Sequence, residues 1–152
     1  MTDDSIIQTI YSRKITSTEE IAELIAHICG NIEKESKESN LPQGKRDRLI
    51  EKIKAYLEVN YVDCGMNMTK VADDFGYVPS YISKLFKDSE GIGMVEYLNR
   101  LRVEKAKELL DQTELLLQEI SERVGFYNSA ALIRVFKKYA GTTPGNYKKM
   151  KR

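Results

Sequence analysis

The chain has 152 residues, which is enough for one domain or for two very small ones that share a helix. Hydrophobic residues make up 41% and charged residues 31%, a balance typical of a soluble helical protein rather than of a disordered chain. No apolar run approaches the roughly 18 residues that a membrane span requires. The N-terminus also lacks the apolar core of a signal peptide, so we expect a cytoplasmic protein.

The charge is unevenly distributed, although the formal net charge is only +1. Residues 1–45 carry a net charge of −3, and residues 46–152 carry a net charge of +4. Seven cations and no acidic residue occur from position 130 to position 152. A local basic surface of this kind favours a polyanion or an anionic membrane as partner. The two cysteines, Cys29 and Cys64, lack metal-ligand spacing and fit a reducing compartment.

Residues 17–38 have the pattern of an amphipathic helix. Ser17 and Glu20 have capping-box spacing, and five aliphatic residues form one stripe: Ile21, Leu24, Ile25, Ile28 and Ile32. A polar linker over 36–45 ends this helix. The stripe has two explanations. It packs on neighbouring helices, or it is a dimerisation helix or the remnant of a regulatory region.

Four helices are expected after the linker. The first, over 46–61, has an apolar face of Leu49, Ile50, Ile53 and Leu57. The second extends from Met68 to Phe75, between Asn67 as N-cap and Gly76 as stop. The third opens at Pro79, a residue suited to a first helical turn. The fourth is long, over 94–111, and its expected buried residues are Val95, Leu98, Leu101, Ala106, Leu109 and Leu110.

The sequence then repeats itself. Four residues of the Met68–Phe75 helix return at an offset of 49 as Leu117, Ile120, Ser121 and Val124. Gly125-Phe126 repeats Gly76-Tyr77, one residue is inserted in the turn, and the next helix follows at an offset of 50. The segment GIGMVEY (91–97) likewise matches GTTPGNY (141–147). An internal duplication of this extent indicates two copies of one structural unit.

Each copy is a helix, a tight glycine turn and a second helix, which is the helix-turn-helix arrangement. Four residues of each second helix share its outer face: Ser80, Ser83, Lys84 and Lys87, and Ala130, Ile133, Arg134 and Lys137. Both faces are slender near the N-terminal end and cationic further along, as entry into the major groove requires. A cationic face is also typical of a helix that is simply solvated, and such units also serve as packing units. A cation at the same position in both copies favours DNA binding.

Three stretches resemble the DNA-binding domain of the AraC/XylS family of bacterial transcription regulators. They are VADDFGYVPSYISKLFKDSEG (71–91), YLNRLRVEKAKELL (97–110) and ISERVGFYNSAALIRVFKKYAGTTPGNY (120–147), and they include a closing G-x-x-P-x-x-Y element. The resemblance covers about two-thirds of the chain, from about residue 46 to residue 152. It implies an all-α fold of seven helices, in which one long linker helix joins two helix-turn-helix subdomains. It also implies that two recognition helices read successive major-groove segments about one helical turn apart.

The expected organisation follows from this resemblance and from the helical pattern before it. Residues 1–45 form an N-terminal helical segment and linker, too short for the sensing or dimerising domain that family members usually carry. Residues 46–152 form the AraC-type DNA-binding domain, preceded by the extra N-terminal amphipathic helix. The first helix-turn-helix is expected at about 67–88, the linker helix at about 94–111 and the second helix-turn-helix at about 116–139.

The resemblance also implies roles for single positions. The implied base-edge readers are Ser80, Ser83 and Lys84 in the first unit, and Ser129, Ala130, Ile133 and Arg134 in the second. The implied phosphate contacts are Tyr81, Lys87, Asn128, Lys137 and Lys138. Tyr81 has the alternative of a half-buried packing residue. The sequence departs from common family members around 130–133, where those carry polar and aromatic residues.

No enzymatic activity is expected, because the chain offers one histidine, no metal cluster, no phosphate-binding glycine loop and no nucleophile motif. We therefore expect no cofactor and no metal. The expected partners are double-stranded DNA at an operator or promoter, RNA polymerase if the protein activates, and a second copy of the chain through the 17–38 helix; no membrane is expected. The alternative is an interaction module whose basic faces bind protein or RNA.

Overall fold

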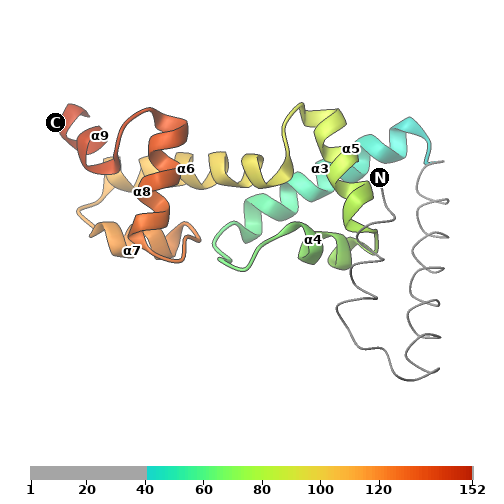
Figure 1. Ribbon diagram of the computed structural model, residues 1–152, viewed down its shortest axis with the longest axis horizontal. Coiled ribbons are helices and arrows are strands. Elements are labelled where there is room, and N and C mark those ends of the chain that lie inside the picture. The colour runs from blue at the N-terminus through green and yellow to red at the C-terminus, as the bar shows by residue number, and fades with distance from the viewer. Residues whose placement is uncertain (1–40, 152) are drawn as a thin grey trace, which may run out of the picture. The chain divides into compact units, whose positions relative to one another are not determined.

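The structure, a computed structural model, describes residues 41–151, and every regular element within them is an α-helix (Figure 1). In chain order these are α3 (Gln43–Asn60), α4 (Met68–Phe75), α5 (Pro79–Glu90), α6 (Met94–Gln112), α7 (Leu117–Arg123), α8 (Ser129–Ala140) and α9 (Pro144–Lys151). The all-α prediction and the seven helices implied by the resemblance are confirmed for this part of the chain. The helix expected over 17–38 lies outside the described residues. Between residues 41 and 151, no helix combines the length and the apolarity that crossing a membrane requires.

Local sequence signals set the helix ends. Asn67 precedes α4, and its side chain accepts a hydrogen bond from the backbone N–H of Lys70 at 3.0 Å, as an N-cap does. Gly76 ends α4 with φ +74°, a left-handed conformation that glycine adopts without steric cost. Pro79 and Pro144 are the first residues of α5 and α9, where a missing backbone N–H is harmless. The expected ends of α4 and the expected start of α5 are therefore confirmed.

Two hydrophobic cores lie on either side of the middle of α6. The first joins α3, α4 and α5 with the start of α6, and its buried residues include Ile53, Leu57, Val71, Ile82, Phe86 and Leu98. The second joins the later part of α6 with α7, α8 and α9, and its buried residues include Val103, Ala106, Ile120, Val124, Leu132 and Phe136. The side chain of Tyr61, just after α3, packs against both cores. The four residues expected on the buried face of α3 are all buried.

Helix α6 is the long linker, and its 19 residues span about 28 Å at 1.5 Å per residue. Its buried residues are Met94, Leu98, Arg102, Val103, Ala106 and Leu110. The prediction that Val95 is buried is wrong, because Val95 is 56% exposed. Leu101 and Leu109 are only half-buried. The helix touches one core with its start and another with its end, so a single apolar stripe does not describe its buried face.

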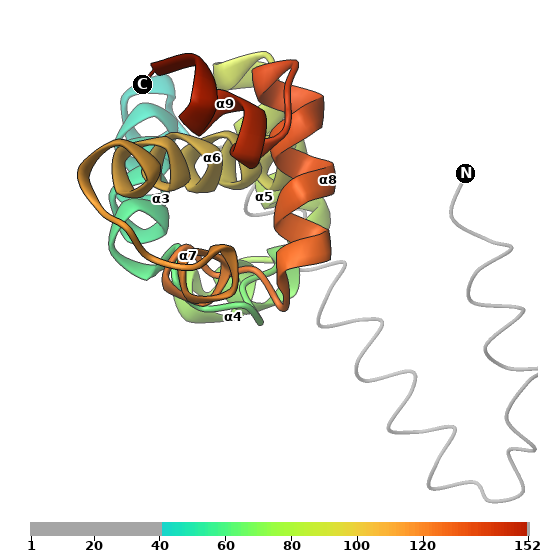
Figure 2. The ribbon, with the colours of Figure 1, turned by 90° about the vertical axis from the view of Figure 1, so that its left-hand side faces the viewer.

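The second helix of each copy lies on the same side of α6. Figure 1 shows α5 and α8 in front of α3 and α6, and Figure 2, the end-on view, shows them on one flank of the described unit. Both helices have 12 residues and end at a glycine with positive φ, Gly91 at +72° and Gly141 at +73°. The two copies therefore present their second helices toward the same side.

Candidate nucleic-acid interface

The outer face of α5 carries the residues that the sequence assigned to it. Ile82 and Phe86 point inward and are fully buried. Because side chains three or four positions apart share a helix face, Ser80, Ser83, Lys84 and Lys87 form a second face that points away from the core. Ser80, Ser83, Lys84 and Lys87 are all exposed. This face is slender at its N-terminal end and cationic toward its C-terminal end.

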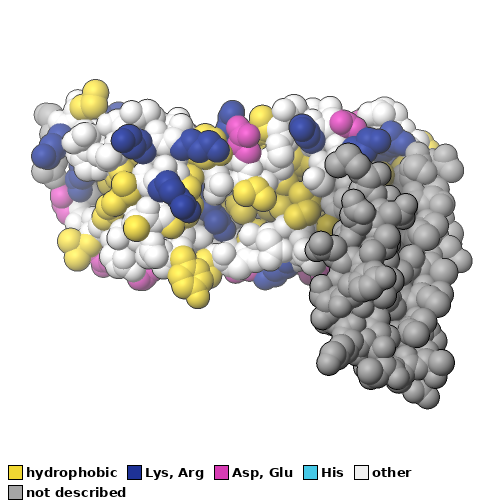
Figure 3. All heavy atoms as spheres, viewed as in Figure 1, with side chains coloured by type: hydrophobic (Ala, Val, Ile, Leu, Met, Phe, Trp, Pro, Cys, Tyr) yellow, Lys and Arg dark blue, Asp and Glu magenta, His cyan; other side chains and the backbone are white. Residues whose placement is uncertain are grey.

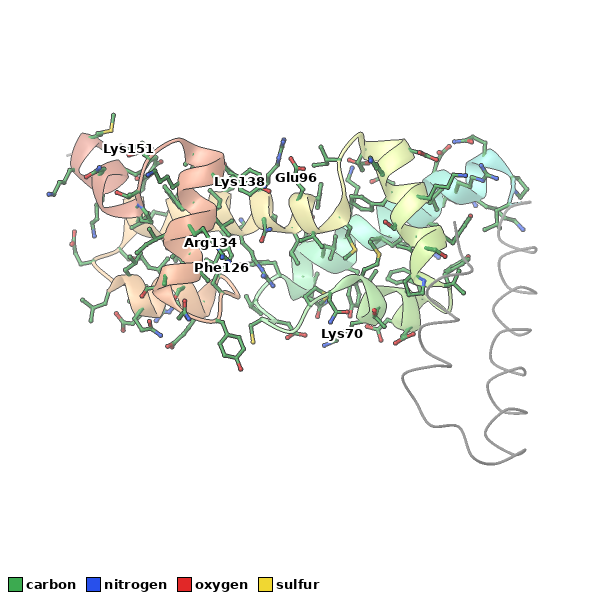
Figure 4. The ribbon with its side chains drawn as sticks, viewed as in Figure 1. Lys70, Glu96, Phe126, Arg134, Lys138 and Lys151 are labelled. Carbon is green, nitrogen blue, oxygen red and sulfur yellow. The ribbon has the colours of Figure 1, made fainter. Side chains whose placement is uncertain are left out.

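The outer face of α8 repeats this arrangement. Leu132 and Phe136 are fully buried, and the exposed residues are Ala130, Ile133, Arg134 and Lys137. Ile133 is 37% exposed, which is enough for an apolar contact. Ser129, at the start of the helix, is half-buried. Figure 4 shows Arg134 and Lys138 projecting from α8, with Phe126 in the turn that leads into it.

The cations of the two outer faces differ from those of the linker helix. On α6, Arg100 pairs with Glu96 at 2.6 Å, Lys105 with Glu108 at 3.0 Å and Lys107 with Glu104 at 2.7 Å. Within residues 41–151, no acidic side chain forms an ion pair with the outward cations of α5 and α8, which are Lys84, Lys87, Arg134 and Lys137. Figure 3 shows Lys and Arg side chains gathered over the α8 half of this side. These cations are available to an external anion.

Three of the residues assigned to phosphate have structural contacts as well. Asn128 is the N-cap of α8: its Oδ1 accepts a hydrogen bond from the backbone N–H of Ala131 at 2.8 Å. Its exposed side-chain amide can still donate to a phosphate. Tyr81 is half-buried, packs against the first core, and stacks on Tyr77 with ring centroids 5.5 Å apart. These contacts support its packing alternative. Lys138, in turn, lies with its Nζ 5.0 Å from the ring centroid of Tyr139.

Sequence reasoning missed Tyr127, which is 84% exposed and stands directly before the N-cap of α8. The available signal was the extra residue in the turn of the second copy, between Phe126 and the start of α8. A large aromatic side chain at the N-terminal end of a recognition helix can contact the sugar-phosphate backbone. The single insertion therefore gives the second copy a surface that the first copy lacks.

Sequence reasoning also missed Arg102, which is only 6% exposed near the middle of α6. Its Nε donates to the carbonyl oxygen of Tyr61 at 2.8 Å, and its Nη2 donates to the carbonyl oxygen of Asp63 at 2.7 Å. Burial lowers the pKa of this guanidinium, but an arginine remains charged at any physiological pH. The position of Arg102 on α6 did not indicate that its side chain is buried, because the carbonyl groups that it binds come from another part of the chain.

Asp63 is held in turn by residues of its own subdomain. Its carboxylate accepts hydrogen bonds from the Nζ of Lys70 and from the backbone N–H of Gly65. These two bonds, that from Lys70 first, lower the pKa of the Asp63 carboxyl group. Asp63 therefore anchors the loop after α3 in two ways. Its side chain accepts hydrogen bonds from Lys70 and Gly65, and its backbone carbonyl group accepts one from Arg102.

The comparisons with known proteins agree with this architecture. A family model described as a helix-turn-helix domain matches residues 65–150. Among curated proteins, the uncharacterized HTH-type transcriptional regulator YtdP of Bacillus subtilis is 38% identical over 87 residues, which are 57% of this chain and 11% of that protein. The chain spans less than half the length of the curated relatives it matches.

Solved structures share the fold. The C-terminal domain of AraT, a response regulator from Geobacillus stearothermophilus, aligns with a TM-score of 0.66 and 31% identity over 67% of this chain and 84% of that one. The DNA-binding domain of the global transcriptional factor AdpA, in complex with a target DNA, aligns with a TM-score of 0.64 and 20% identity over 68% of this chain and 92% of that one. This architecture and these relatives place the described residues among the DNA-binding domains of transcription regulators. The chain belongs to the helix-turn-helix family of the AraC type.

Proposed function

We propose that residues 41–151 bind one double-stranded DNA site by placing α5 and α8 in two successive segments of the major groove. The observation that carries this proposal is the pair of matching outer faces. Both lie on one side of α6, and both carry outward cations at the same helical positions, Lys84 with Arg134 and Lys87 with Lys137. A single exposed cationic helix is common, but two copies with the same outward pattern fit two consecutive grooves.

The proposed roles follow from side-chain chemistry. Arg134 has the planar fork that binds O6 and N7 of guanine with two hydrogen bonds, whereas Lys84 offers a single charge with looser geometry. Ala130 and Ile133 offer apolar contacts to a thymine methyl group. The serines contribute short hydroxyl contacts to base edges: Ser80, Ser83 and Ser129. Lys87, Lys137, Lys138 and the side-chain amide of Asn128 contact phosphates.

The crystal complex of AdpA with its target DNA supports the proposal, since its DNA-binding domain has the same fold. At 20% identity, this similarity supports a shared fold but does not indicate which bases this chain prefers. The operator sequence must therefore come from experiment.

The remaining partners are proposals about the whole chain. Residues 17–38 are proposed to self-associate through their aliphatic stripe. RNA polymerase is the proposed partner where the protein activates transcription, and the cytoplasm is the proposed location. We propose no enzymatic activity. Deleting residues 1–40 removes the stripe and leaves α3 intact, so sedimentation of the two forms tests self-association. Equal sedimentation behaviour would assign the stripe to intramolecular packing.

Selection from a random duplex library tests the central proposal. The expected result is a site with two short motifs about 10 bp apart, one for each recognition helix. Affinity for the selected site should fall steeply with salt, with a log–log slope of roughly 0.9 for each phosphate neutralised. Duplex RNA of the same sequence serves as control, because its deep, narrow major groove does not admit a helix. An unselective library, or equal affinity for the RNA, would favour the interaction-module alternative.

A further inference from the structure

The two helix-turn-helix subdomains also touch each other away from α6. The loop after α3, beginning at Tyr61, belongs to the first subdomain, and the turn at Gly125-Phe126 belongs to the second. Tyr61 packs against both hydrophobic cores. The side chain of Arg102 lies between this loop and this turn, with its guanidinium carbon 5.5 Å from the ring centroid of Phe126.

Arg102 binds the C-terminal end of α3. The last carbonyl groups of a helix have no partner within the helix and carry a partial negative charge. The guanidinium donates to the carbonyl oxygen of Tyr61, the C-cap residue of α3, and to that of Asp63, in the loop that follows. Arg102, on α6, therefore binds the loop that begins at the end of α3, about 40 residues earlier in the chain, and its guanidinium lies over the ring of Phe126. One side chain thus joins all three elements.

The glycines of the two turns show how close this contact is. Gly76 and Gly125 occupy the same position in the two copies and both have positive φ, +74° and +83°. A Cβ at Gly76 would meet nothing within 4 Å. A Cβ at Gly125 would lie 2.2 Å from the carbonyl oxygen of Tyr61 and 3.0 Å from Nε of Arg102. The turn of the second copy therefore needs glycine both for its conformation and for its approach to the first subdomain.

We propose that Arg102 is a positioning residue that fixes the orientation of the two helix-turn-helix subdomains, so that the protein reads the spacing between two DNA motifs as well as the motifs. This inference rests on the proposed function. Helix α6 alone sets a distance, but it can bend or twist over its length. The contacts of Arg102 with Tyr61, Asp63 and Phe126 restrict such bending of α6, because they hold the two subdomains together beside the helix.

The first experiment measures orientation without DNA. Spin labels are attached to Lys87→Cys and Lys137→Cys in the 152-residue chain with Cys29→Ser and Cys64→Ser, and the distance distribution is recorded by pulsed electron spin resonance. The wild-type distribution should be narrow, and Arg102→Met should broaden it at least about twofold, since more relative orientations become populated. Arg100→Met, an exposed residue of the same helix, is the control. An equally narrow distribution in a folded Arg102→Met protein would overturn the proposal.

The second experiment measures spacing. Duplexes carry the two selected motifs at the native separation and at separations changed by one to three base pairs. For Arg102→Met, affinity for the native site should fall roughly tenfold, affinity for each motif alone should stay unchanged, and the preference for one spacing should weaken. An unchanged spacing preference would contradict the proposal. If the wild-type protein selects no site at all, the proposed function fails. The distance measurement still tests whether Arg102 fixes the orientation of the subdomains.

Gly125→Ala and Gly76→Ala provide a matched pair should Arg102→Met fold poorly. Both substitutions strain a left-handed turn by a similar amount, but only the one at Gly125 forces the Tyr61 carbonyl group away. Gly125→Ala should broaden the distance distribution and the spacing preference, and Gly76→Ala should change neither. Equal effects of the two substitutions would contradict the proposal that this contact fixes the orientation of the subdomains.

Discussion

The ring of Phe136 meets the ring of Tyr147 edge-on, with centroids 5.6 Å apart and planes at 72°. Fifty positions earlier, Phe86 and Tyr97 form the same contact at 5.4 Å and 75°. One member of each pair lies on the second helix of a copy, and the other lies on the helix that follows it. The duplication therefore includes the start of the following helix, which is α6 after the first copy and α9 after the second.

These two phenylalanines should support separate cores to a similar extent. Phe86→Ala and Phe136→Ala should each lower the free energy of unfolding by about 3–5 kcal/mol, since both rings are fully buried. Urea unfolding measures the loss, and amide exchange shows which half of the protein opens first. Met150→Ala, at a residue 80% exposed, is the control and should change stability by less than about 0.5 kcal/mol. Opening of the same half in both variants would argue against two cores.

Loss of a base reader should affect one motif only. Arg134→Ala should cost about 1–3 kcal/mol of binding free energy and relax the preference at one base pair of one motif. Lys84→Ala should do the same in the other motif, more weakly, because lysine lacks the planar fork. Competition titrations with single-base variants of the selected site measure both effects. Lys105→Ala, on the linker helix, is the control; a uniform loss across all variants would reclassify the residue as a phosphate contact.

Substitutions at the N-caps of α4 and α8 should distinguish a role in helix stability from a role in DNA binding. Asn128→Asp keeps the oxygen that caps α8 but removes the side-chain amide donor and adds a negative charge. Thermal stability should therefore be retained. DNA affinity should fall at least about tenfold, because like charges placed together cost several kcal/mol. Asn67→Asp makes the matching substitution at the cap of α4, where it also removes the hydrogen bond from Nδ2 to the Gly65 carbonyl oxygen, and it should affect binding far less. Similar losses from both variants would remove Asn128 from the proposed interface.

The spacing of the two motifs should be fixed by the protein. Inserting 5 bp between the motifs turns one of them to the opposite face of the DNA, about half a helical turn away. A linker helix of about 28 Å cannot follow that rotation, so affinity should fall to that of a single motif. Inserting 10 bp restores the face but not the distance, and it should also fail. Tight binding to either insertion would mean that the two helices act independently.

The sequence predicted the helices and most outward residues, and it failed where a residue's neighbours come from elsewhere in the chain. The outward set on α5 follows from the spacing of Ile82 and Phe86, which a helix places on one face whatever surrounds it. Val95 was predicted to be buried from the same kind of spacing and is 56% exposed. On α6 this reasoning fails, because the two ends of the helix face different cores.

The sequence by itself determined the helix caps, the two repeated units and the cationic faces, because these depend on residues a few positions apart and on a pattern repeated at an offset of 49 to 50. Only the tertiary structure decided that Arg102 is buried and that Gly125 approaches Tyr61, whereas its counterpart Gly76 is open. Both facts arise where residues 61–63, α6 and the second turn meet. A local pattern cannot specify that meeting, because the energy of a buried arginine depends on carbonyl groups about 40 residues away.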